Sequence, residues 1–167
     1  MAEKTYTFNE LPETLEAVKA LPEAAMKDPY DVAALAILAF HVYHKNPDES
    51  VKIINFLKGP QELSAYDKSF LKDRFGNDYL IDSYFVGSTP ENSYTPDKPY
   101  SFTIFEQTHS RDQFNEGYIS LWIRCGGADS PRSMKLRTKP STGEWFLWEY
   151  SGILLSIKTP AKADPWA

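Results

Sequence analysis

No stretch of this chain says more about its architecture than Glu144-Trp145-Phe146-Leu147-Trp148-Glu149-Tyr150-Ser151-Gly152-Ile153-Leu154-Leu155-Ser156-Ile157. Residues 145–150 hold four aromatic side chains, and an aliphatic run follows them. Alternate side chains of an extended strand point to opposite faces. One face would carry Trp145, Leu147 and Glu149, and the other would carry Phe146, Trp148 and Tyr150. Because both faces are rich in large apolar groups, we expect a strand that is covered on both sides, by the chain's own helices or by a partner.

The composition is typical of a soluble globular protein, with 42% hydrophobic and 25% charged residues in a chain of 167. A chain of this length predicts a single domain over residues 1–167. The net charge of −5 lacks the strongly basic balance of nucleic-acid-binding proteins, so we predict no nucleic-acid partner.

Neither export nor membrane insertion is indicated. Residues 1–6 lack the basic and apolar regions of a signal peptide. The apolar stretch Val32–Tyr43 is interrupted by His41 and is too short to span a bilayer. Cys125 is the only cysteine, so no intramolecular disulfide can form. We therefore expect a cytoplasmic protein without a membrane partner.

Helical periodicity occupies about residues 10–76. A weakly amphipathic first helix would end at Pro22. Asp28 and Pro29 suit the start of a second helix, which is apolar nearly all round from residue 32 to 42 and is therefore predicted to be central and buried. Two further helices would begin at Asn46-Pro47 and at Ser64, the first ending at Gly59-Pro60 and the second near Gly76.

Residues 86–99 form a proline- and glycine-rich loop, and alternating strands follow it. We expect strands at 100–107, 118–125, around 134–137 and at 145–150, with 153–157 as a fifth strand or a bent continuation. The short turns between them require antiparallel neighbours. The chain thus predicts an α+β fold: three to four N-terminal helices packed on a C-terminal antiparallel meander sheet of four to five strands. The sheet would span about residues 100–158, with a tail at 159–167.

The sequence contains no motif of a catalytic, metal or cofactor site. His41 and His44 share a helix face, but a structural zinc ion needs four ligands, and Cys125 lies in a remote strand. Cys125 also falls on the apolar face of that strand, which favours a buried, inert thiol. We predict no catalytic residue, no metal and no cofactor.

Three segments together resemble an uncharacterised family of small bacterial α+β domains, of a type frequent in Gram-positive anaerobes. They are Ser83-Tyr84-Phe85-Val86-Gly87-Ser88-Thr89-Pro90-Glu91-Asn92-Ser93-Tyr94-Thr95-Pro96, the turn Gly127-Ala128-Asp129-Ser130-Pro131-Arg132, and the ending Trp145 to Trp166. The resemblance covers roughly residues 30–167. It implies a bacterial α+β domain with no known activity, and it supplies no catalytic residues.

A non-catalytic binding module is the leading functional interpretation, with another protein as its partner. Its site would combine the loop with Tyr84, Tyr94 and Tyr100 and the basic edge at Arg132 and Lys135. The cations Arg132, Lys135, Arg137 and Lys139 surround a single predicted strand, either as a solvated outward face or as a patch that binds acidic groups. A homodimer through the aromatic strand or the tail is compatible with this interpretation.

The alternative is a small-molecule-binding or enzymatic cone of the NTF2-like kind, in which helices close over a curved sheet and leave a pocket. Trp122, Arg124, Trp148 and Glu149 would line that pocket. Burial of Glu149 would raise its pKa unless a cation such as Arg124 compensates. Finally, a free terminus does not normally expose a tryptophan, so Trp166 is expected to pack back onto the domain.

Overall fold

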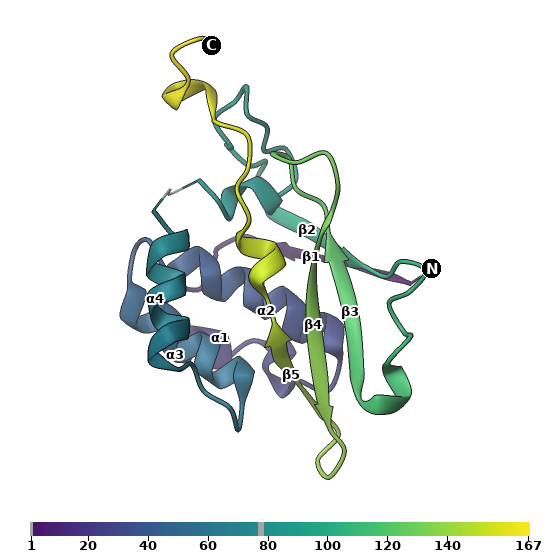
Figure 1. The fold of residues 1–167 in the computed structure, drawn as a ribbon. Helices are drawn as coiled ribbons and strands as arrows, with labels where there is room; N and C mark the ends of the chain where they lie inside the picture. The colour runs from purple at the N-terminus through teal and green to yellow at the C-terminus, as the bar shows by residue number, and fades with distance from the viewer. Residues whose placement is uncertain (1, 77–78) are drawn as a thin grey trace.

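The computed structural model describes residues 2–76 and 79–167, in which four α-helices lie on one side of a five-stranded sheet (Figure 1). This is the α+β architecture that the sequence predicts. The helices are α1 (Leu15–Lys19), α2 (Pro29–Val42), α3 (Pro47–Lys58) and α4 (Ala65–Arg74). The strands are β1 (Glu3–Phe8), β2 (Tyr100–Phe105), β3 (Tyr118–Ile123), β4 (Arg132–Lys139) and β5 (Glu144–Glu149). Short 3₁₀ turns include η1 (Pro22–Ala25), η2 (Asp82–Tyr84), η3 (Phe114–Glu116), η4 (Ser151–Leu154) and η5 (Ala161–Ala163).

Side-chain caps start the helices where the sequence places them. The Asp28 carboxylate accepts a hydrogen bond from the Tyr30 amide at 2.9 Å, and Asn46 accepts one from Glu49 at 3.2 Å. Ser64 and Asp67 cap each other's backbone amides reciprocally at the start of α4. These bonds satisfy amides that have no partner inside the helix.

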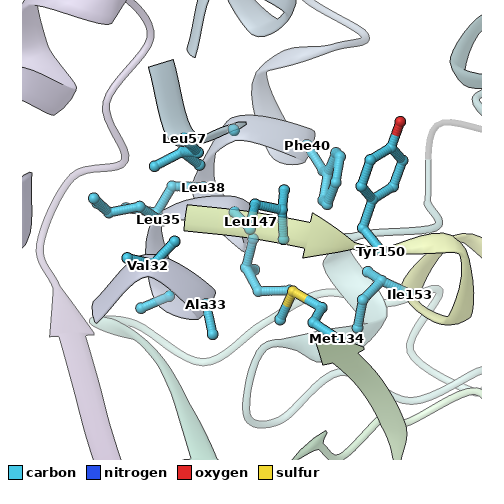
Figure 2. Close-up of a cluster of buried hydrophobic side chains, with 14 of the residues drawn as sticks. Val32, Ala33, Leu35, Leu38, Phe40, Leu57, Met134, Leu147, Tyr150 and Ile153 are labelled. Carbon is cyan, nitrogen blue, oxygen red and sulfur yellow. The ribbon is translucent and has the colours of Figure 1, made fainter. Parts of the chain in front are cut away.

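Helix α2 is the centre of the core. Its residues 32–40 are all fully buried. It packs against α3 on one side and against strands β2 to β5 on the other. Figure 2 shows side chains of α2 meeting Met134 of β4, Leu147 of β5 and Ile153. The prediction of a central, fully covered helix is therefore confirmed.

The sheet is antiparallel throughout, in the order β1-β2-β3-β4-β5. A β-bulge interrupts the pairing of β4 with β5, because Lys135 lies opposite Glu149 whereas Leu136 lies opposite Leu147. Trp148 is the extra residue of this bulge. Alternation along β3 and β4 sends one set of side chains toward α2 and the other set away from the helices. We call this second side the outer sheet face.

The described part of the chain covers the helix side of β5 fully and its other face only in part, where Phe146 packs beside Gly59. Leu147 is buried on the helix side, whereas Trp148 is half-exposed on the outer sheet face. All four helices lie on the same side of the sheet, so they do not cover Trp148 on the other face of β5. Cover of that face by a partner, the other half of the expectation, stays a prediction.

The fifth strand lies at the N-terminus and not at 153–157. Residues 151–154 form the turn η4, and β1 pairs with β2 along its whole length. Two side chains fasten β1 to helix α2: the Tyr6 hydroxyl and the Lys4 ammonium both donate to the Asp31 carboxylate at 2.6 Å. In this segment Tyr6 and Phe8 alternate with Thr5 and Thr7, but two apolar residues are too short a pattern to predict a strand by themselves.

The tail beyond η4 runs over the 86–99 loop at one end of the sheet (Figure 1). The Ala161 amide donates to Pro90 O at 2.8 Å, and the Lys162 amide donates to Ser93 Oγ at 3.0 Å. Beyond this anchor the Trp166 amide bonds only locally, to Asp164. The Trp166 side chain is 93% exposed, so the prediction that it packs onto the domain is wrong.

Candidate functional site

Tyr84 and Tyr94, two of the sequence candidates, are buried. The Tyr84 hydroxyl donates to Ile153 O, and the Tyr94 hydroxyl donates to Lys158 O at 2.5 Å. Burial raises the pKa of Tyr94 to about 12. Both rings therefore lie inside the domain, where each hydroxyl holds the segment that follows β5.

The segments that carry the family resemblance meet around Tyr94. The side chain of Asn92 accepts hydrogen bonds from the amides of Thr89 and Thr95, both at 3.0 Å, and thereby shapes the loop. A Cβ at Gly127 would lie 2.4 Å from the Tyr94 hydroxyl. This close approach explains why a glycine is needed where the 126–131 turn meets the loop.

Arg132 belongs to the same end of the sheet and Lys135 does not. The Arg132 guanidinium donates to Ser156 O at 2.9 Å and so ties β4 to the tail. The Lys135 ammonium instead donates to Gln113 Oε1 at 2.9 Å on the outer sheet face. The structure thus separates the five residues of the leading hypothesis.

Tyr100 lines a cleft of about 740 Å³ together with the N-terminal segment 9–14 and the end of α2. His41, Lys45 and Lys98 also line it. His41 Nε2 lies 3.4 Å from Asp82 Oδ1, and its ring contacts Phe85 edge-on at 5.7 Å between centroids. No group of three or more potential metal ligands occurs within residues 2–76 and 79–167.

An aromatic–cation cluster stands on the outer sheet face, formed by Tyr118, Lys135, Arg137 and Trp148. The Arg137 guanidinium lies 4.6 Å from the Trp148 ring centroid and 5.5 Å from that of Tyr118. The two rings meet edge-on at 5.9 Å. Lys135 Nζ lies 5.9 Å from the Tyr118 centroid. Each contact falls within the reach of a cation–π interaction.

Trp122 and Arg124 extend this surface along β3. The Arg124 guanidinium lies 4.4 Å from the Phe105 ring centroid, and Phe105 is the β2 neighbour of Trp122. Trp122 and Arg124 line a hollow of about 770 Å³ with residues 105–110. A second hollow of about 340 Å³ adjoins it, since both include His109, Ser110 and Ser120.

The four residues of the alternative pocket therefore lie away from the helices. Trp122 and Trp148 are half-exposed on the outer sheet face, and Arg124 and Glu149 are exposed. The space between helix α2 and the sheet is filled by core side chains (Figure 2). These four residues therefore do not line a pocket between the helices and the sheet.

The segment 106–117, which borders the hollows, is fastened to the helical layer. The Glu106 carboxylate accepts two hydrogen bonds from Arg111, at 2.6 and 3.1 Å, and a short one from the Tyr30 hydroxyl of α2. The Arg111 guanidinium lowers the pKa of Glu106. These bonds of Glu106 to Arg111 and Tyr30, which we call the Glu106 clamp, hold the segment that forms one wall of the two hollows beside β3.

Sequence reasoning did not include Tyr118 and Arg137 among the site residues. The alternation of the two strands does predict that Tyr118 and Arg137 face outward. Their approach to Trp148 was not visible, since it depends on the bulge between β4 and β5.

Comparison with known proteins supplies a family. A model of the family described as a domain of unknown function, DUF6935, matches residues 10–161. The chain belongs to DUF6935. No curated protein and no solved structure matches the chain. The DUF6935 match includes the aromatic–cation cluster and the 86–99 loop, whereas β1 lies outside it. None of the helices in the described residues is long and apolar enough to cross a membrane.

Proposed function

We propose that this chain is a non-catalytic binding module whose outer sheet face takes up an acidic segment of another protein. The observation that carries the proposal is the aromatic–cation cluster at Arg137. Among residues 2–76 and 79–167, no carboxylate forms an ion pair with Arg124, Lys135 or Arg137. The guanidinium groups of Arg124 and Arg137 lie against aromatic rings instead, and a ring does not neutralise their charge.

Charge and shape both favour an acidic peptide as the ligand. The chain as a whole carries −5, whereas the cluster and its extension along β3 present three cations, with Glu149 opposite Lys135. Two further carboxylates, Glu106 and Asp112, line the hollows and are paired with Arg111 and His109. Opposite charge across an interface steers encounter and orients the partner. The hollows beside β3 offer depth for side chains of an extended segment. Tryptophan and arginine are also the residues that most often anchor protein interfaces.

The test is selection from a displayed library of random peptides, followed by affinity measurements on variants. We expect the selected peptides to be rich in Asp and Glu, and to bind the Arg137→Ala and Trp148→Ala variants about tenfold more weakly or worse. Binding should also weaken as salt is added.

Arg74→Ala is the matched control, because Arg74 lies 5.0 Å from the Phe70 ring centroid on α4, in the helical layer. This variant removes an exposed cation–π pair away from the proposed surface and should bind as the native chain does. Peptides that bind Arg137→Ala and Arg74→Ala equally well would contradict the proposal.

Small-molecule binding in the cleft at Tyr100 is a second candidate. Its volume of about 740 Å³ falls in the range of small-ligand sites, and His41, Lys45 and Lys98 supply polar groups at an apolar wall. A thermal-shift screen of small carboxylates and phosphates tests this function. Ligands of the cleft should lose their effect in Lys98→Ala and keep it in Lys72→Ala, which lies on α4. Equal shifts in both variants would count against the cleft.

A further inference from the structure

Strand β1 (Glu3–Phe8) presents an unused row of backbone hydrogen-bonding groups. It pairs with β2 along its whole length, and no other strand of the described residues pairs with its far side. Glu3, Lys4, Thr5 and Thr7 are exposed. The strand is thus an open edge of the sheet, a form that readily pairs with another strand.

The register identifies the outward groups. Residues of an antiparallel strand alternate between those that bond the neighbouring strand and those whose N–H and C=O point away from it. The Glu106 amide donates to Ala2 O at 3.1 Å, so Ala2, and by alternation Lys4, Tyr6 and Phe8, bond β2. The N–H and C=O groups of Glu3, Thr5 and Thr7 therefore point away from the sheet.

The opposite edge of the sheet, along β5, is covered. The Trp145 amide donates to Met26 O at 2.8 Å, and the Lys27 ammonium donates to Thr142 O at 2.6 Å. The bulge at Trp148 also interrupts the regular backbone of β5. Bulges and covering segments are the usual protection of a sheet edge. Strand β1 has neither, and it contains no proline.

We propose that β1 pairs antiparallel with β1 of a second copy of this chain, with Thr5 opposite Thr5 of the second copy. Glu3 then lies opposite Thr7 of the second copy. Every outward residue of either strand falls in a hydrogen-bonded pair, so each outward N–H and C=O gains a partner. A shift by two residues leaves one outward residue of each strand unpaired. The edge is therefore self-complementary in a single register, as a two-fold interface requires.

The single chain already holds β1 in the conformation that pairing needs. Asp31 binds both Lys4 and Tyr6, so little conformational freedom is lost on association. Threonine side chains suit a strand, and pairs of threonines on neighbouring strands stabilise it. The charges of Glu3 and Lys4 cancel within the strand.

The pairing is expected to be weak. Six residues a side bury less surface than a standard interface does. Two copies of charge −5 also repel each other, and added salt screens that repulsion. Association should therefore strengthen with salt, in contrast to the binding of an acidic peptide by the outer sheet face.

Sedimentation velocity of the full chain tests the proposal, over concentrations that reach roughly the millimolar range where weak dimers form. We expect a monomer–dimer equilibrium that Thr5→Pro weakens by about tenfold or more, since the central pair loses both of its hydrogen bonds. Thr5→Pro should keep the circular dichroism spectrum of the native chain, because in the monomer the lost N–H points to solvent. Thr5→Val, which keeps the N–H and a β-branched side chain, is the matched control and should dimerise far more tightly than Thr5→Pro.

Amide hydrogen exchange of the unaltered chain gives a second readout that needs no variant. Protection of the Thr5 and Thr7 amides should rise with protein concentration, whereas the Lys4 and Tyr6 amides should be protected at every concentration. A chain that remains monomeric throughout overturns the proposal. A dimer that forms without added protection at Thr5 and Thr7 also overturns it, because the copies then meet elsewhere.

Discussion

The two faces of the sheet are built from the same strands and differ in almost every physical respect. On β4, Met134 and Leu136 face helix α2 and are 1% and 0% exposed. Between and beyond them, Lys135 and Arg137 face outward and rest on aromatic rings. The inner face excludes water and supplies the free energy of folding, whereas the outer sheet face leaves Lys135 half-exposed and Arg137 exposed, where the proposed partner would reach them. We therefore expect that stability and the proposed binding can be changed separately by substituting neighbouring residues.

Leu147→Ala should produce the largest effect. Leu147 is 1% exposed and packs against α2, so its truncation leaves a cavity and should lower the free energy of unfolding by about 2–5 kcal/mol. Urea unfolding followed by circular dichroism measures the change. Tyr66→Ala, at a side chain that is 78% exposed, is the control and should leave the unfolding midpoint nearly unchanged. A loss below about 1 kcal/mol for Leu147→Ala would show that the inner face is not the main source of stability.

Glu106→Gln tests the clamp that joins the two layers. The variant loses charge-assisted hydrogen bonds to Arg111 and should cost about 1.5–3 kcal/mol. The pKa of Glu106 is lower in the folded chain than its ordinary value of 4.5, so its contribution is complete above that pH and is lost as the pH falls through the folded pKa.

The unfolding free energy of the native chain should therefore fall more steeply below pH 4.5 than that of Glu106→Gln. Asp112→Asn, at an exposed carboxylate that pairs with His109, provides the comparison and should change stability little. Parallel acid titrations of the native chain and Glu106→Gln would refute the role of the clamp.

Trp148→Ala should have the smallest effect on stability, about 1 kcal/mol, although it removes the largest side chain of the outer cluster. Residues 147 and 148 are adjacent in the chain and point to opposite faces. Leu147→Ala and Trp148→Ala therefore compare directly how much stability each face of the sheet contributes. Unfolding curves under identical conditions give the ratio of the two losses. If Trp148→Ala costs as much as Leu147→Ala, the two faces do not differ as described.

The helices could be predicted from the sequence because their signals are local. Asp28, Asn46 and Ser64 cap amides within three residues of themselves, so short-range chemistry fixes the helix starts. Strand β1 could not be predicted, since its only buried side chain is Tyr6 and its strand character comes from pairing with β2 far along the chain.

The candidate site was predictable only in part. Alternation assigns Lys135, Arg137 and Trp122 to outward positions, and this needs no tertiary information. Burial of Tyr84 and Tyr94 could not be read from the sequence, because a loop tyrosine serves equally well as a ligand contact or as a buried hydrogen-bond donor. The exposure of Trp166 depended on where the tail is anchored, which the hydrogen bonds at Pro90 and Ser93 decide.

The central position of α2 has a consequence for the chain as it is synthesised. The helix is complete at residue 42, but the strand that covers its last side ends at residue 149. At a translation rate of about 5–20 residues per second, roughly 5–20 seconds pass between the synthesis of this apolar helix and that of strand β5. We expect α2 to be open to chaperones or to aggregation during that interval. Conditions that slow translation between α2 and β5 should therefore lower the yield of folded protein more than conditions that slow it before α2.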